Sequence, residues 1–188
     1  MLSRLIGASL RGYCAGEHAL AWYAEGIASA PVDMHLESPS FECGQRIPAR
    51  FAGKGVGLNI SPALSWSNVP AEARELVLLV EDASAPLPKP FVHVLVTGIP
   101  PEIYGLHEGE LSSTLRAPMV LGRNSFGRVA YAGPRALPGH GEHRYSYQLF
   151  ALNSSLLLDG AARRRGLLNT IQNTVISRAR LDGLFERD

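Results

Sequence analysis

The feature that most constrains the fold is a glycine-rich turn, Gly139 to Arg144, that runs directly into an alternating strand, Tyr145 to Leu152. Successive side chains of a strand point to opposite faces, so His143 and Tyr145 share one face and Arg144 lies on the other. The turn therefore brings an imidazole and a phenol together at the mouth of a half-buried strand. We expect Arg144, on the opposite face, to make a structural ion pair or bonds to carbonyls.

Two further segments predict strands with polar side chains at or near their ends. Residues 75–80 form a buried strand that leads into a turn carrying Asp82 and Pro86. Residues 91–97 are rich in β-branched side chains and carry His93 among apolar neighbours. Taken alone, an aspartate in a turn is most often a local backbone acceptor, and a histidine on an apolar strand is most often a core residue. Together they indicate a small polar pocket.

The remaining pattern favours a mainly β fold. Residues 53–57 predict a flexible glycine loop that lacks the ending of a phosphate-binding loop, and residues 100–127 a long polar connection. Residues 160–180 have the strongest helical periodicity. Many strands with few helices are typical of an antiparallel β-sandwich with peripheral helices. The strand signals, in chain order, come from residues 32–38, 41–51 (a hairpin-like pair), 75–80, 91–97, 145–152 and 181–185.

The first 30 residues differ from the rest. Residues 17–28 predict a short amphipathic helix that ends before Pro31, so we divide the chain into an N-terminal helical extension, 1–30, and a main domain, 31–188. The apolar stripe of this helix favours packing against the main domain, with a partner surface as the alternative. The apolar run 5–10 is too short for an export signal, and no stretch is long enough to span a bilayer. We expect a cytoplasmic protein.

Composition and charge narrow the class of partner. With 46% hydrophobic and 19% charged residues, the chain is an ordinary globular protein. Its formal net charge is +1, so no field of the whole molecule favours nucleic acid or an anionic membrane. The basic run 163–165 has no interleaved aromatic residues and predicts a solvated helix face or helix start. Cys14 and Cys43 lack a metal or redox spacing and are expected to be free thiols.

These segments together resemble the phosphatidylethanolamine-binding protein family, specifically its bacterial YbhB/YbcL-like branch, which is similar to the Raf kinase inhibitor proteins. The similarity covers the chain from about residue 33 to its C-terminus, in the family's order and spacing. It implies a large central sheet, a smaller sheet and peripheral N- and C-terminal helices. The matching segments are Ser61–Trp66 with Val69–Pro70, Asp82–Pro86, Phe91–His93 leading to Gly98–Pro100, Gly133–Pro134 and Gly139–Tyr145.

The resemblance also implies a ligand pocket. It would accept a small anion, namely a phosphoryl or carboxylate group or a phospholipid head group, without a cofactor or metal and without catalysis. Anion binding would be strengthened because histidine donors can be charged. The pocket residues implied by the resemblance are Asp82, His93, His143 and Tyr145, with Phe91 and Pro86 shaping the walls.

The sequence departs from the family in the turn that carries Asp82. The family's usual Asp-Pro-Asp-Ala-Pro appears with Ala83 in place of the first proline and Ser84 in place of the second aspartate. Losing one carboxylate makes the mouth of the pocket less negative, which should favour an incoming anion. The resemblance implies a cis peptide bond between Ala85 and Pro86.

Several alternatives stay open. Family members inhibit kinases and serine proteases, so the pocket rim could instead bind a protein partner. Ser84, with Asp82 and a histidine, could form the triad of an esterase-like hydrolase, although it does not lie in a Gly-x-Ser-x-Gly elbow. The histidines have no spacing that would enforce a zinc site. We also expect a homodimer, since bacterial relatives commonly pair and the extension offers an apolar stripe.

Overall fold

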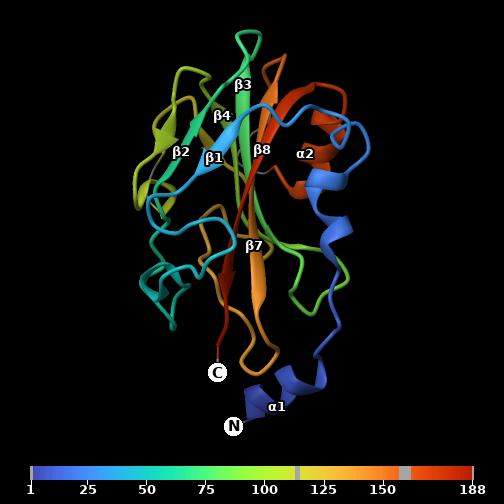
Figure 1. Cartoon of the computed structure of the whole chain (residues 1–188), viewed down its shortest axis with the longest axis vertical. Helices are drawn as coiled ribbons and strands as arrows, with labels where there is room; N and C mark the ends of the chain where they lie inside the picture. Colours follow the sequence, from blue (N-terminus) through green and yellow to red (C-terminus); the bar gives the residue numbers. More distant parts are fainter. Residues whose placement is uncertain (1, 113–114, 157–161, 188) are drawn as a thin grey trace.

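The computed structural model describes residues 2–112, 115–156 and 162–187 and contains two antiparallel sheets (Figure 1). The larger sheet has the strand order β6-β4-β3-β7-β8, and the smaller sheet the order β1-β2-β5. The mainly β, two-sheet fold is therefore confirmed. The strands are β1 (His35–Glu37), β2 (Leu64–Ser67), β3 (Glu75–Asp82), β4 (Phe91–Ile99), β5 (Gly105–Leu106), β6 (Val120–Leu121), β7 (His143–Leu152) and β8 (Val175–Phe185).

Helices are short and peripheral. In the described part of the chain, the α-helices are α1 (Leu2–Ser9) and α2 (Arg164–Ile171). In Figure 1, α1 lies at the end of the molecule where the chain also terminates, and α2 lies beside the large sheet. Single turns of 3-10 helix occur in the described loops: η1 (Glu17–Ala19), η2 (Ala21–Tyr23), η3 (Ala49–Phe51) and η4 (Glu110–Ser112).

The core is organised around β3, whose eight residues are all buried. Because side chains alternate along a strand, Leu76, Leu78 and Val80 pack on one face, toward the small sheet. Val77 and Leu79 pack on the other face, against α2 and the N-terminal segment. A strand covered on both faces explains the nearly continuous apolar sequence of residues 76–80.

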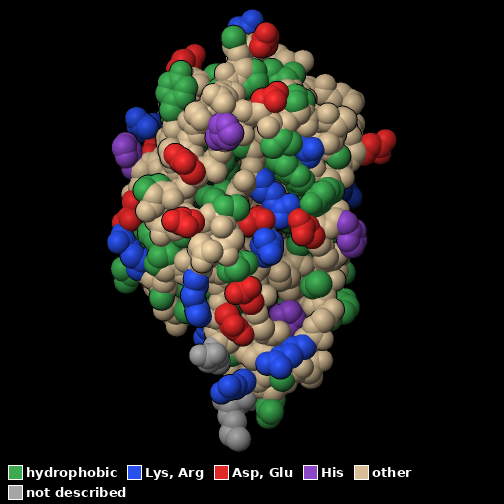
Figure 2. Space-filling model, viewed as in Figure 1, with side chains coloured by type: hydrophobic (Ala, Val, Ile, Leu, Met, Phe, Trp, Pro, Cys, Tyr) green, Lys and Arg blue, Asp and Glu red, His purple; other side chains and the backbone are tan. Residues whose placement is uncertain are grey.

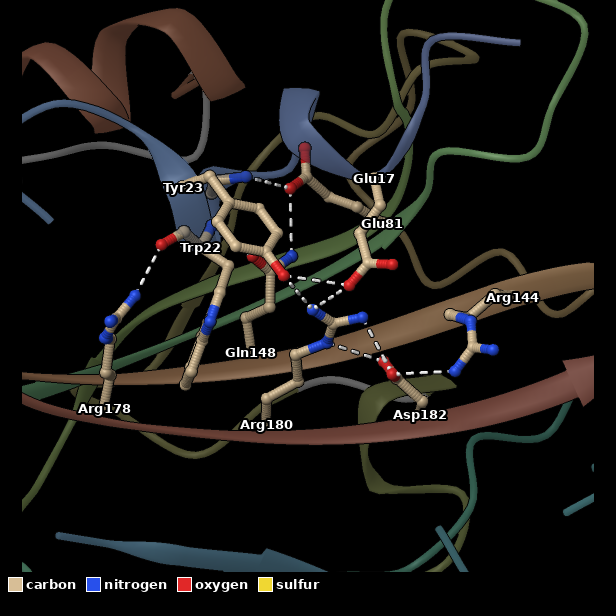
Figure 3. A network of polar contacts seen from close by, with 10 residues as sticks. Glu17, Trp22, Tyr23, Glu81, Arg144, Gln148, Arg178, Arg180 and Asp182 are labelled. Carbon is tan, nitrogen blue, oxygen red and sulfur yellow. Dashed lines mark hydrogen bonds and ion pairs between the residues drawn. The ribbon is translucent and has the colours of Figure 1, made fainter. Parts of the chain in front are cut away.

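Residues 17–28 do not form the predicted α-helix. They form η1, η2 and a turn in which Gly26 has φ 73°, and Ala21 and Ile27 are fully buried against the large sheet. Polar side chains of the sheet form hydrogen bonds with backbone amides and carbonyls of this segment, which in an α-helix would bond to each other (Figure 3). Glu81 accepts from the Ala21 amide at 2.8 Å, and the Arg178 guanidinium donates to the carbonyls of three residues, Trp22, Ala28 and Ala30.

The predicted C-terminal helix is also largely wrong. Of residues 160–180, α2 covers Arg164–Ile171 and β8 begins at Val175, while 157–161 lie outside the described residues. The predicted strand 181–185 is the end of β8. Residues four apart lie on the same face of a helix and also on the same face of a strand. The spacing of Ile171, Val175 and Ala179 therefore does not distinguish a helix from a strand. Pairing with β7 decides in favour of the strand.

Three further segments differ from what the sequence predicted. Residues 41–51 do not form a hairpin-like pair: the amides of Gly44 and Ile47 donate to carbonyls of β8, so the segment covers that sheet edge. Residues 5–10, treated only as a short apolar run, belong mostly to α1. The connection 100–127 contains β5, η4 and β6.

Charged side chains of both signs are interspersed on the face shown in Figure 2. Several charged side chains of the described residues form ion pairs. Within the basic run 163–165, Arg164 forms an ion pair with the buried Glu81 and donates to the Ala19 carbonyl. Arg164 is also the first residue of α2, so the predicted helix start is confirmed, whereas the Arg164 side chain is paired rather than solvated. Cys14 and Cys43 are both free and exposed.

Replacing Arg178 by methionine should destabilise the fold by about 2–4 kcal/mol, because three carbonyls lose their donor and the guanidinium leaves its place over the Trp22 ring, 4.2 Å away. Urea unfolding at neutral pH measures the change. Arg74→Met, at an exposed position, is the matched control and should stay within about 0.5 kcal/mol of the wild type. A loss below about 1 kcal/mol in Arg178→Met would show that the N-terminal segment does not depend on this side chain.

Candidate functional site

Strand register brings the predicted site residues together. Phe91, Asp82 and Tyr145 are in register across the adjacent strands β4, β3 and β7. His93 and His143 each lie two residues from this row, which places them on the same face. The rings of His93 and Tyr145 have their centroids 4.9 Å apart, and His143 contacts Asp82 directly.

Asp82 holds the local structure of its turn and orients His143. Its Oδ1 accepts from the amides of Ser84 at 2.8 Å and Ala85 at 3.0 Å, while its Oδ2 contacts Nδ1 of His143 at 2.7 Å. Both side chains are almost completely buried. One carboxylate oxygen therefore closes the turn, as expected of a turn aspartate, and the other orients His143.

A chain of contacts continues from His143 to the N-terminal segment. His143 Nε2 lies 2.9 Å from Nδ1 of His140, and Nε2 of His140 lies 3.0 Å from the carbonyl oxygen of Leu10. The carboxylate and the carbonyl at the two ends are acceptors, so three hydrogen bonds require three protons. With all three bonds formed, the group of Asp82, His143 and His140 has no net charge, whichever atom holds each proton.

The N-terminal segment packs on the two turns that flank the contact between Asp82 and His143. Gly7 of α1 packs directly on the 138–140 turn, where a Cβ atom would come within 2.0 Å of the Pro138 carbonyl oxygen. Arg11 Nε donates to the Gly139 carbonyl at 2.8 Å, and the Gly16 amide donates to the Ala83 carbonyl at 3.2 Å. Residues 7–16 therefore contact both the turn that carries His140 and the turn that follows Asp82.

His93 has a free nitrogen in the interior. Its side chain is 5% exposed, and its Nδ1 donates to the Ala132 carbonyl at 2.7 Å. Nε2 is buried and has no hydrogen-bond partner in the described part of the chain. Burial lowers the pKa of His93, although the nearby Asp82 carboxylate opposes this effect. The imidazole is thus held neutral, with the Nε2 lone pair unused.

Tyr145 supplies a second group, a hydroxyl donor for which the described residues offer no hydrogen-bond acceptor. Its hydroxyl oxygen accepts from the Arg135 amide at 3.2 Å, which leaves the O–H group as a donor. Burial raises the pKa of Tyr145 well above its ordinary value, so the phenol stays protonated. Phe91 is partly exposed beside this pair, with its ring centroid 4.9 Å from that of His93.

Pro86 is partly exposed in the turn after Asp82, but its peptide bond is not cis as predicted. Within the described ranges, the cis bond is Ala117–Pro118. The turn after Asp82 is closed by the two amide hydrogen bonds to its carboxylate, so it does not need the cis geometry.

The residues do not assemble the hydrolase alternative. Ser84 Oγ accepts from the Arg144 amide at 3.1 Å, and no histidine among the described residues is hydrogen-bonded to it. Asp82 and His143 are instead bonded to each other, and His143 to His140. The prediction for Arg144 is confirmed, because its guanidinium pairs with Asp182 at 3.1 Å on the opposite face (Figure 3).

Neither a metal site nor a membrane-spanning helix is found in residues 2–112, 115–156 and 162–187. No group of three or more His, Cys, Asp or Glu side chains is placed to hold a metal ion. No helix there has the length and apolar character needed to cross a bilayer.

Sequence reasoning missed three contributors: His140, the Ala132 carbonyl and the Arg135 amide. A histidine three residues before His143, between two glycines, was visible in the sequence, but its direction depends on the turn and on contact with Leu10. The two backbone groups leave no trace in a sequence, because every residue type carries a carbonyl and every type except proline carries an amide N–H.

Comparison with known proteins gives a consistent result. A family model described as phosphatidylethanolamine-binding protein matches residues 37–186. A UPF0098 protein of Methanothermobacter thermautotrophicus is 38% identical over 156 residues, which cover 82% of this chain and 99% of that protein. A similar protein in Aquifex aeolicus is 35% identical, over 82% of this chain and 90% of that one.

Solved structures agree with the fold. The structure of a putative phosphatidylethanolamine-binding protein homologue from Chlamydia trachomatis aligns with a TM-score of 0.74 and 33% identity, over 82% of this chain and 98% of that one. Escherichia coli YbcL aligns with a TM-score of 0.78 and 23% identity, over 84% of this chain and all of that one. The register of β3, β4 and β7, the family model and these relatives lead to one conclusion: the chain belongs to the phosphatidylethanolamine-binding protein family, in its bacterial-type branch.

Proposed function

We propose that this protein is a non-enzymatic binding protein that holds a small anion, a phosphoryl or carboxylate group, at His93, His143 and Tyr145. The observation that carries the proposal is the buried Nε2 of His93, which has no partner in the described residues. Buried polar atoms of native proteins are nearly always paired, and an unpaired one needs an explanation. A ligand that bonds this nitrogen supplies one.

The donors available to an anion come from two neighbouring rings. Tyr145 offers its O–H group, and His93 offers Nε2–H once it takes up a proton. A protonated imidazole makes a charge-assisted hydrogen bond, which is stronger than a neutral one. Asp82 contributes by orienting His143, since both of its oxygens already accept hydrogen bonds within the protein.

His143 joins the site only after a rearrangement. Its Nε2 faces His140, so an anion that bonds His143 must displace the His140 ring. That displacement also breaks the contact between His140 and the Leu10 carbonyl. Occupancy of the site is thereby linked to the docking of the N-terminal segment, residues 1–30, which the family model does not include.

Regulation of a protein partner is the second part of the proposal. A carboxypeptidase Y inhibitor whose structure was solved in complex with its proteinase has the same fold, with a TM-score of 0.53 and 16% identity. On this chain, the outer side of α1 carries Leu2, Leu5 and Ile6, which are 46–73% exposed. This stripe would meet a protein partner or a second copy in a homodimer, in a cytoplasmic setting.

Phosphate affinity should rise as the pH falls. His93 is neutral at pH 7 because burial lowers its pKa below the ordinary value of about 6.5, so a bound anion must bring a proton with it. The Kd for phosphate should be at least about tenfold lower at pH 5.5 than at pH 8, with the change extending below pH 6.5. The neighbouring titratable groups are Asp82, His143 and Tyr145, of which Tyr145 stays protonated throughout.

Calorimetric titration of phosphate, in two buffers of different ionisation enthalpy, measures both the affinity and the proton uptake. His93→Phe should remove the pH dependence, whereas His18→Gln, at an exposed histidine, is the control and should retain it. An affinity that does not change with pH, or that is equal in His93→Phe, would remove His93 from the site.

Replacing His140 by alanine should increase phosphate affinity by about three- to tenfold, because His143 Nε2 no longer faces His140 and, with a proton on it, can donate to the anion. It should also cost about 1 kcal/mol of stability through the lost contact with Leu10. Titration and urea unfolding measure the two effects, and His107→Ala, at an exposed histidine, serves as the control. If affinity instead falls as far as in His143→Ala, His140 is itself a ligand and does not block the site.

A further inference from the structure

A cavity of about 590 Å³ is lined in part by Ala132, Gly133 and Arg135, in the segment whose backbone also contacts His93 and Tyr145. It is enclosed by the loop 53–60, by η4 and by residues 121–135. None of Asp82, Pro86, Phe91, His93, His143 and Tyr145 lines it. It is therefore a different site from the one proposed above, with which it shares a wall.

The lining of this cavity carries charge of one sign. Lys54, Arg128 and Arg135 are the charged residues among those that line it, and no aspartate or glutamate is included. The chain as a whole has 18 basic and 17 acidic residues, so the local balance departs from the average. In the described structure, none of the three side chains has an ion pair or a side-chain hydrogen bond.

The carboxylates nearest in sequence to the lining are engaged elsewhere. Glu108 pairs with Arg50, and Glu110, next to Leu111 of the lining, pairs with Arg116. The cavity thus keeps an uncompensated positive potential. A concave wall of one sign concentrates ions of the opposite sign.

Exposed apolar side chains accompany the basic ones. Leu58, Phe126 and Val129 are 68%, 56% and 45% exposed, and all three line this cavity. Large apolar side chains gathered at a concavity indicate a place where an apolar group is bound. The ring of Phe126 is held in position by Phe91, with centroids 4.8 Å apart.

Two asparagines fix the walls. Asn59, at φ 56°, accepts from the Gly133 amide at 2.9 Å and so joins the loop 53–60 to the shared wall. Asn124 accepts from the amides of Phe126 and Arg128 and donates to the Ala130 carbonyl, which shapes the opposite loop. A wall already in its final form loses little entropy when a ligand binds.

We propose that this cavity binds a small organic anion with an apolar body, such as a carboxylate or phosphate ester on an aromatic or short acyl group. The three cations select the anionic group, and the three apolar side chains bind the body. The volume lies within the range of about 300–1,000 Å³ that is typical of small-molecule sites. This site goes beyond the proposed function and does not depend on it.

Anilinonaphthalene sulfonate is a suitable probe, because it joins a sulfonate to an aromatic body and fluoresces when bound. The folded full-length protein should bind one equivalent at micromolar Kd. Arg128→Glu/Arg135→Glu should weaken binding at least tenfold, and the control Arg74→Glu/Arg165→Glu, at exposed positions outside the cavity, should change it less than twofold. Phenylnaphthylamine, which lacks the sulfonate, should bind at least tenfold more weakly than the probe.

Binding that is equal in the cavity variant and the wild type, or equal for the neutral analogue, would overturn the proposal. Since Arg135 also contributes its amide to Tyr145, Lys54→Glu/Arg128→Glu is the second variant if the first lowers the melting temperature. His93→Phe separates the two sites: it should abolish the pH dependence of phosphate binding and leave the probe affinity within twofold. If His93→Phe loses the pH dependence of phosphate binding and keeps its probe affinity, both sites are supported. If the wild type does not bind the probe, the cavity site alone is rejected.

Discussion

Three buried carboxylates on the central strand β3 hold the peripheral parts of the molecule in place. Glu75 accepts from the amides of Gly98 and Leu156, each at 2.7 Å, while Glu81 and Asp82 accept from amides of the N-terminal segment and of the turn after β3. A buried carboxylate is costly unless its oxygens are paired, so each of these residues requires its loop to dock in one position. The strand that forms the core thereby also fixes the loops.

This arrangement links the site to the N-terminal segment. Glu81 and Asp82 are consecutive, so they point to opposite faces of the sheet. Glu81 fixes the Ala21 amide on one face, and Asp82, through His143 and His140, reaches the Leu10 carbonyl on the other. The segment from Leu10 to Ala21 is therefore fastened at both ends by neighbouring residues of one strand, and displacement of His140 releases one of these two attachments.

The sequence predicts the parts of this structure that depend on local alternation. The strands 75–80, 91–97 and 145–152 were found within a few residues, and the shared face of His143 and Tyr145 follows from their spacing. The meeting of Asp82 with His143 needs the register of β3 against β7, and the family resemblance supplied it where local pattern could not. Residues 17–28 were wrongly predicted because their backbone partners, Glu81 and Arg178, are distant in sequence.

The two proposed sites, which share the segment Ala132–Arg135, would both attract negative charge, but by different physical means. At the buried histidines, the segment contributes backbone groups that orient the rings of His93 and Tyr145, while burial keeps His93 neutral. Positive charge on His93 would appear only when a proton is taken up, so the anion affinity of this site would follow pH and would be little affected by salt. At the cavity, Lys54, Arg128 and Arg135 are exposed basic side chains, so their attraction for an anion would fall as salt screens it over about 8–10 Å. One backbone segment would therefore contribute both to a proton-dependent site and to a salt-dependent one.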